Sequence, residues 1–168
     1  MDWINQIGNW NPQFLRECRG HLKPRSVIAT LGTSAVFQIL FCALVFQNVT
    51  TESQIDTRWL YICRILTWLL PYFLFIVGGY YLVKDFTQEE KKGTLNFIRL
   101  SPRPAREILL GKLLGVPILP YLVVLSIVPL HIFSMVQTGV PPTFFFSYYT
   151  ILGATAFFCF SLALLAGI

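Results

Sequence analysis

Four long stretches with almost no charged residue dominate this chain. They cover residues 27–46, 59–83, 113–136 and 144–168, are 20 to 25 residues long, and together contain one charged residue, Arg64. The hydrocarbon core of a bilayer is about 30 Å thick, and a helix needs about 20 apolar residues to cross it. The sequence therefore predicts an all-α, multi-span helical integral membrane protein with four transmembrane helices.

The composition excludes the main soluble alternatives. Only 12% of the 168 residues are charged, against about 25% in soluble domains. The 15% of aromatic residues excludes a disordered chain. The four cysteines form no CxxC pair and lack close histidine partners, so we predict neither a disulfide framework nor a metal site.

The basic residues are distributed unevenly around the apolar runs. Segments 1–26 and 84–112 hold 11 of the 13 Lys and Arg residues, whereas segment 47–58 holds one and segment 137–143 none. Cytoplasmic segments of membrane proteins are enriched in Lys and Arg. We therefore predict that the N-terminus and segment 84–112 are cytoplasmic, and we expect no nucleic-acid partner.

Residues 1–26 are predicted to form a cytoplasmic amphipathic segment. Asn11 followed by Pro12 is typical of a helix cap with proline in the first turn. Four apolar residues then recur at helical spacing, with charged residues between them, up to Pro24. Such a helix is suited to lie in the membrane interface. The apolar positions are Phe14, Leu15, Cys18 and Leu22.

Segment 84–112 is too long for a simple turn between two spans. Gly93 is expected to end an extension of the second span, and Thr94 to cap a new short helix. Pro102 and Pro104 break that helix, and another begins at Ala105. The short helix carries apolar residues among basic ones, which indicates either a partner-binding surface or side chains that dip into lipid. These residues are Leu95, Phe97 and Ile98.

Two sequence motifs in these cytoplasmic segments resemble a known family. The stretch EEKKGTLNFIRLSP, followed by EILLGK, is similar to the cytoplasmic loop of type-2 exporter permeases of the ATP-binding-cassette (ABC) transporters. The N-terminal stretch NPQFLRECRG resembles the beginning of many of those permeases. The residues at matching motif positions are Glu89, Gly93, Thr94, Leu95, Pro102, Gly111 and Lys112.

The resemblance implies a role in ATP-driven transport. The loop between spans two and three would be a coupling helix that docks on a nucleotide-binding subunit, and residues 11–26 a connecting helix. Coupling would then involve Glu89, Gly93, Thr94, Leu95, Phe97, Ile98 and Pro102. A second permease copy would complete the pathway within the cell membrane, and the family implies a bacterial inner membrane.

The chemistry is expected on a partner chain. Gly111-Lys112 is followed by leucine and lacks the upstream glycine of a phosphate-binding loop. We therefore expect no catalytic residue and no cofactor in this chain, with ATP and Mg²⁺ on the partner. Family permeases usually have six spans, so a chain that ends within the fourth apolar run is expected to be truncated. The alternatives are a non-transporting membrane scaffold or assembly factor with a cytoplasmic docking loop, and an intramembrane enzyme.

Two polar residues within the predicted spans are further candidates. Arg64 lies five residues after Trp59, where its long side chain either extends to the outer headgroups or lines a pathway and pairs across helices. His131 lies in the outer half of the third span. It is predicted to be a polar contact between helices rather than a catalytic base.

Overall fold

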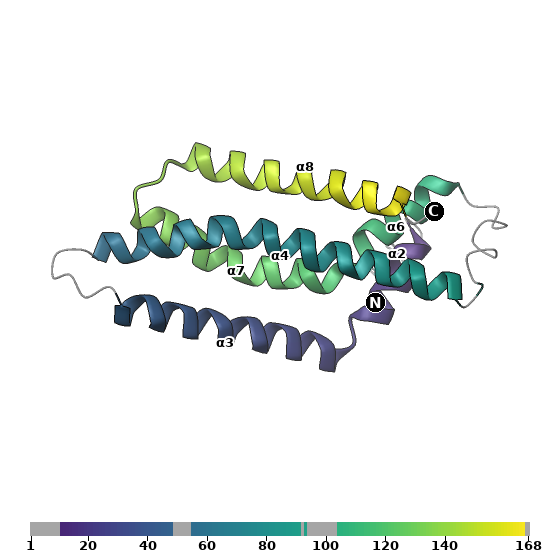
Figure 1. Ribbon diagram of the computed structural model, residues 1–168, viewed down its shortest axis with the longest axis horizontal. Helices are drawn as coiled ribbons and strands as arrows, with labels where there is room; N and C mark the ends of the chain where they lie inside the picture. Colours follow the sequence, from purple (N-terminus) through teal and green to yellow (C-terminus); the bar gives the residue numbers. More distant parts are fainter. Residues whose placement is uncertain (1–10, 49–54, 92, 94–103, 167–168) are drawn as a thin grey trace, which may run out of the picture.

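The protein is a bundle of α-helices, shown by a computed structural model that describes residues 11–48, 55–91, 93 and 104–166. Four long helices lie lengthwise beside one another and alternate in direction, and two short helices gather at one end (Figure 1). The part of the chain that the structure describes contains no β-strand. We call the end that carries the two short helices the basic end, and the opposite end the far end.

The four long helices match the four predicted spans in number and order. They are α3 (Pro24–Asn48), α4 (Ile55–Lys91), α7 (Ile118–Gln137) and α8 (Pro142–Ala166). Each is long and apolar enough to cross a membrane. The prediction of an all-α, multi-span membrane protein is confirmed. The short helices are α2 (Pro12–His21) and α6 (Ala105–Gly115).

Helix α4 is the centre of the bundle and packs mainly on α7 and α8. Its 37 residues correspond to about 55 Å at 1.5 Å per residue, which exceeds the thickness of a bilayer core. The polar residues 84–91 therefore extend beyond the apolar part at the basic end. Apolar residues spaced four apart give α4 one continuous buried face, which comprises Ile62, Leu66, Leu70, Leu74, Leu82 and Phe86.

The third predicted span, residues 113–136, is divided in the structure. Residues 113–115 belong to α6, and α7 begins at Ile118. Proline has no N–H, so Pro117 cannot donate to the Leu113 carbonyl four residues earlier. The Tyr121 hydroxyl donates to that carbonyl instead, at 3.1 Å. This replacement satisfies a backbone group that apolar surroundings would otherwise leave unpaired.

Local signals set two of the helix ends at the basic end. The Asn11 side chain accepts from the Phe14 N–H at 3.1 Å and caps α2, with Pro12 in the first turn. After the last residue of α4, Lys91, Gly93 adopts a φ of +68° and donates its N–H to the Glu90 carbonyl. Glycine adopts this left-handed conformation without the strain that a Cβ would add.

Candidate functional site

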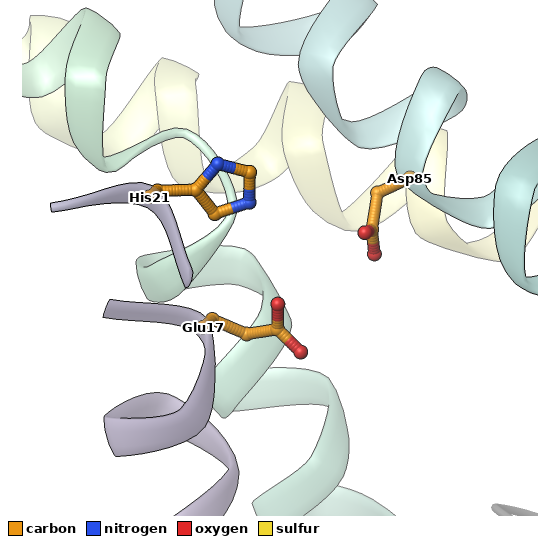
Figure 2. A group of neighbouring side chains, drawn as sticks. All are labelled: Glu17, His21 and Asp85. Atoms are coloured by element: carbon orange, nitrogen blue, oxygen red, sulfur yellow. The ribbon is translucent and has the colours of Figure 1, made fainter. Parts of the chain in front are cut away.

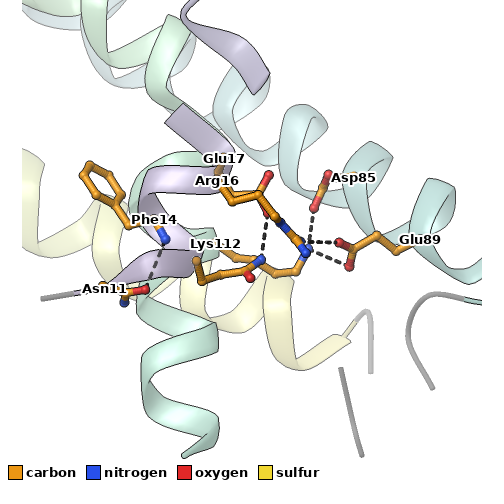
Figure 3. A network of polar contacts seen from close by, with 8 residues as sticks. Asn11, Phe14, Arg16, Glu17, Asp85, Glu89 and Lys112 are labelled. Carbon is orange, nitrogen blue, oxygen red and sulfur yellow. Dashed lines mark hydrogen bonds and ion pairs between the residues drawn. The ribbon is translucent and has the colours of Figure 1, made fainter. Parts of the chain in front are cut away.

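Three segments that are far apart in the sequence meet through charged side chains at the basic end. Lys112 of α6 is 2% exposed, although it is a lysine. Its Nζ atom lies 2.5 Å from Oδ2 of Asp85 and 2.7 Å from Oε2 of Glu89 (Figure 3). Because a buried ammonium must be paired to be tolerated, this geometry fixes α6 against the end of α4.

The two carboxylates belong to one face of α4. Asp85 and Glu89 are four residues apart, which places them one turn apart on the same side of the helix. The aromatic ring of Phe86 also lies near the ammonium of Lys112, with its centroid 4.8 Å from Nζ. A cation over an aromatic ring adds a further attraction. The two carboxylates and the Phe86 ring therefore form a site on α4 that suits the cation of the neighbouring helix.

Helix α2 joins the same network through Arg16. The Nη2 atom of Arg16 lies 2.9 Å from Oε1 of Glu17 and 3.3 Å from Oε1 of Glu89. Glu17 also accepts from Nε2 of Gln13 at 2.7 Å, so α2 is both internally braced and linked to α4. We call the five charged residues the Lys112 cluster, which consists of Arg16, Glu17, Asp85, Glu89 and Lys112.

Two glycines allow α6 to approach α2 closely. A Cβ at Gly111 would lie 2.8 Å from Cβ of Gln13 and 2.9 Å from the backbone nitrogen of Phe14. A Cβ at Gly115, one turn later, would lie 2.6 Å from Cβ of Glu17. Small residues four apart let two helices pack with their backbones close together. The Gly111–Gly115 face therefore positions α2 so that Arg16 reaches α4.

Asn11 links the beginning of α2 to α6 as well as capping it. Its Nδ2 atom donates to the Glu107 carbonyl at 2.7 Å, and the side chain is almost fully buried.

Loss of a helix cap costs about 1 kcal/mol, and loss of a further hydrogen bond about 1 kcal/mol. We expect Asn11→Ala to lower the free energy of unfolding by roughly 2 kcal/mol. Asn11→Ser keeps an uncharged cap acceptor but is too short to replace the amide donor, so a thermal melt should show a smaller loss for Ser than for Ala; equal losses would contradict this division.

A histidine lies beside the cluster. Ligand atoms of Glu17, His21 and Asp85 are within 4.8 Å of one another (Figure 2). These residue types bind metals elsewhere, but the Lys112 ammonium already lies against Asp85 and would repel a cation. The five members of the Lys112 cluster carry three negative and two positive charges. The arrangement therefore favours ion pairing within the Lys112 cluster over metal binding.

Cys18 lies on α2 next to the cluster. Burial, and after it the negative charge of Glu17, raise the pKa of its thiol. The thiol therefore stays protonated at neutral pH, and a protonated thiol is neither a nucleophile nor a metal ligand.

The structure places two of the seven predicted coupling residues. Glu89 belongs to the Lys112 cluster, and Gly93 lies just beyond the end of α4. The remaining five lie outside the described residues, in the segment that joins α4 to α6. These five are Thr94, Leu95, Phe97, Ile98 and Pro102.

The two polar candidates within the spans lie in different surroundings. His131 is fully buried, and its Nε2 and Nδ1 atoms lie 3.0 Å from Oγ1 of Thr67 and 2.9 Å from the Tyr149 hydroxyl. It thus connects α7 to α4 and α8. Arg64 is exposed on α4, where it borders a shallow groove beside Tyr61 and Trp68.

Several residues of the cluster were not predicted from sequence as a site. Lys112 was expected only as a motif position and a topology signal, and Arg16, Glu17 and Asp85 had no predicted partner. Two local signals were present: the four-residue spacing of Asp85 and Glu89, and that of Gly111 and Gly115. Neither signal identifies the helix on the other side of the contact.

The fold and this site define a multi-pass helical membrane protein with a charged junction at one end. Residues 21–168 match the family model described as ABC-2 family transporter protein. The chain therefore belongs to the ABC-2 transporter family. The comparison with curated proteins found no match. The comparison with solved structures found none either.

Proposed function

We propose that this chain is the transmembrane permease subunit of an ABC exporter, in which ATP hydrolysis by a partner subunit drives substrate across the cell membrane. ATP and Mg²⁺ would bind to the partner, and a second permease copy would complete the pathway. Family membership supports the permease role. The basic end, where residues 92–104 join α4 to α6, would face the cytoplasm and the partner.

The observation that carries this proposal is the position of the Lys112 cluster. The segment with the coupling motif is flanked by α4 and α6, and Lys112 ties these two helices together through Asp85 and Glu89. A force that the partner exerts on residues 92–104 would therefore move α4 and α6 together. Helix α7 follows α6 after only two residues, so the movement would reach the bundle.

The test is to purify the tagged protein from its native membrane with mild detergent and to identify what accompanies it. We expect a subunit with a phosphate-binding loop that hydrolyses ATP in the complex. Recovery of the protein with no ATP-hydrolysing subunit would contradict the exporter and favour the scaffold.

A further inference from the structure

A cavity of about 570 Å³ lies between α3 on one side and α4 and α7 on the other, and it is partly open to the surroundings. Along α3 its lining extends from Ala29 to Phe37, and on α4 from Leu69 to Tyr81. These residues belong to the half of the bundle nearer the basic end. The cavity therefore lies at the depth of the bilayer leaflet on that side.

The lining matches an acyl chain. Most of it is apolar and includes Phe73, Val77, Val123 and Ile127. Along α3 the lining extends over nine positions, from Ala29 to Phe37, or about 12 Å at 1.5 Å per residue. Four of the fourteen lining residues carry a hydroxyl, so the cavity offers a polar ligand few hydrogen bonds in place of those it makes with water.

A polar contact joins α3 to α7 along the wall of the cavity. Oγ of Ser34, which lines the cavity, lies 2.7 Å from Oγ of Ser126 on α7. Nε2 of Gln38 donates to Oγ of Ser34 at 3.2 Å. At the far end α3 is held again, where the Trp59 ring packs against Phe46 at 5.5 Å. Helix α3 thus contacts α7 through Ser34 and α4 through Phe46. Ser34 is the one buried residue of α3.

Positive charge lies beyond the end of the cavity that is nearer the basic end. Lys23 and Arg25 are both exposed where α3 begins, a turn or two before the first lining residue. Glu17 on α2 and Asp85 on α4 are already paired within the Lys112 cluster. The two cations therefore remain available for an anionic group at the membrane surface.

We propose that this cavity binds an acyl chain of an anionic phospholipid from the adjacent leaflet, with the lipid phosphate at Lys23 and Arg25. Lipid occupies the space between α3 and the rest of the bundle, along the lining from Ala29 to Phe37. The site concerns binding alone, so it does not depend on the exporter function.

The experiment uses the full chain in lipid nanodiscs with a photoreactive phosphatidylglycerol that carries a diazirine on its acyl chain. Phosphatidylcholine with the same chain is the neutral comparison. Val123→Trp fills the cavity, and Leu125→Trp, on the same helix but 66% exposed, is its matched control. The double variant Lys23→Gln, Arg25→Gln removes the two cations that would bind the lipid phosphate. Arg106→Gln, which removes an exposed cation on α6, is the control for loss of charge.

We expect phosphatidylglycerol to label peptides of α3 and α7 severalfold more than phosphatidylcholine does. Val123→Trp should reduce that labelling severalfold and Leu125→Trp should not, while the double charge variant should remove the preference for phosphatidylglycerol. Competition by excess unlabelled phosphatidylglycerol on the unchanged chain gives a readout that needs no variant. Equal labelling by both lipids, with no competition by unlabelled phosphatidylglycerol, would overturn the proposal. It would also be overturned if a Thr33→Cys variant formed a disulfide with a second copy and the lipid did not label the cavity.

Discussion

Lys112→Met is expected to destabilise the protein more than any other single change at the basic end. Methionine fills a similar volume but leaves Asp85 and Glu89 as neighbouring carboxylates, 18% and 12% exposed, without their shared cation. Removing one partner of a buried ion pair costs about 3–5 kcal/mol. Thermal unfolding of the detergent-purified protein measures the loss.

A matched control and a rescue make this result specific. Lys84 is an exposed lysine on α4, so Lys84→Met should change stability by no more than about 1 kcal/mol. Adding Asp85→Asn and Glu89→Gln to Lys112→Met removes the stranded charges and should recover part of the loss. If Lys112→Met has no larger effect than Lys84→Met, or if the rescue fails, the ion pairs are not what holds α6 on α4.

Gly111→Val should separate α2 from α6. The first added carbon would lie 2.8 Å from Cβ of Gln13 and 2.9 Å from the backbone nitrogen of Phe14. The Phe14 N–H is bonded to the Asn11 cap, so the backbone cannot move away without breaking that hydrogen bond. Overpacking costs about 1–3 kcal/mol, and we expect the upper part of this range.

Gly153→Val is the control for the same change of residue. Gly153 lies in α8, and a Cβ there would meet nothing within 4 Å. Thermal melts of the two variants should therefore differ by about 2 kcal/mol in the free energy of unfolding. Equal melting of both variants would show that α2 does not depend on close contact with α6.

The predictions from sequence succeeded where the cause is local. A run of apolar residues long enough to cross a bilayer fixes the existence of each span, whatever its neighbours are. The break between α6 and α7 also has a local cause, because Pro117 cannot donate a helical hydrogen bond, but residues 113–136 were predicted as one unbroken span. That proline is visible in the sequence, but its effect in an apolar run depends on whether a group such as the Tyr121 hydroxyl replaces the missing donor.

The site was less predictable because its contacts join distant segments. Lys112 and Asp85 are 27 residues apart, and Arg16 and Glu89 are 73 apart. Nothing in the pattern around Lys112 distinguishes a buried lysine from an exposed one in a basic loop. Glu17 illustrates the same limit, because it lies between the apolar residues of α2 and yet is buried at the contact with α6.

The most direct test of the account compares two glycines with the same backbone conformation at opposite ends of the bundle. Gly93 and Gly139 both have a φ of +68°, and each donates its N–H within a turn. Proline at either position removes that donor and requires a φ near −65°. In the complex purified with the proposed ATP-hydrolysing subunit, Gly93→Pro should lower ATP hydrolysis severalfold, and Gly139→Pro should leave it unchanged. Equal hydrolysis by both variants would contradict the claim that the segment between α4 and α6 couples this chain to its partner.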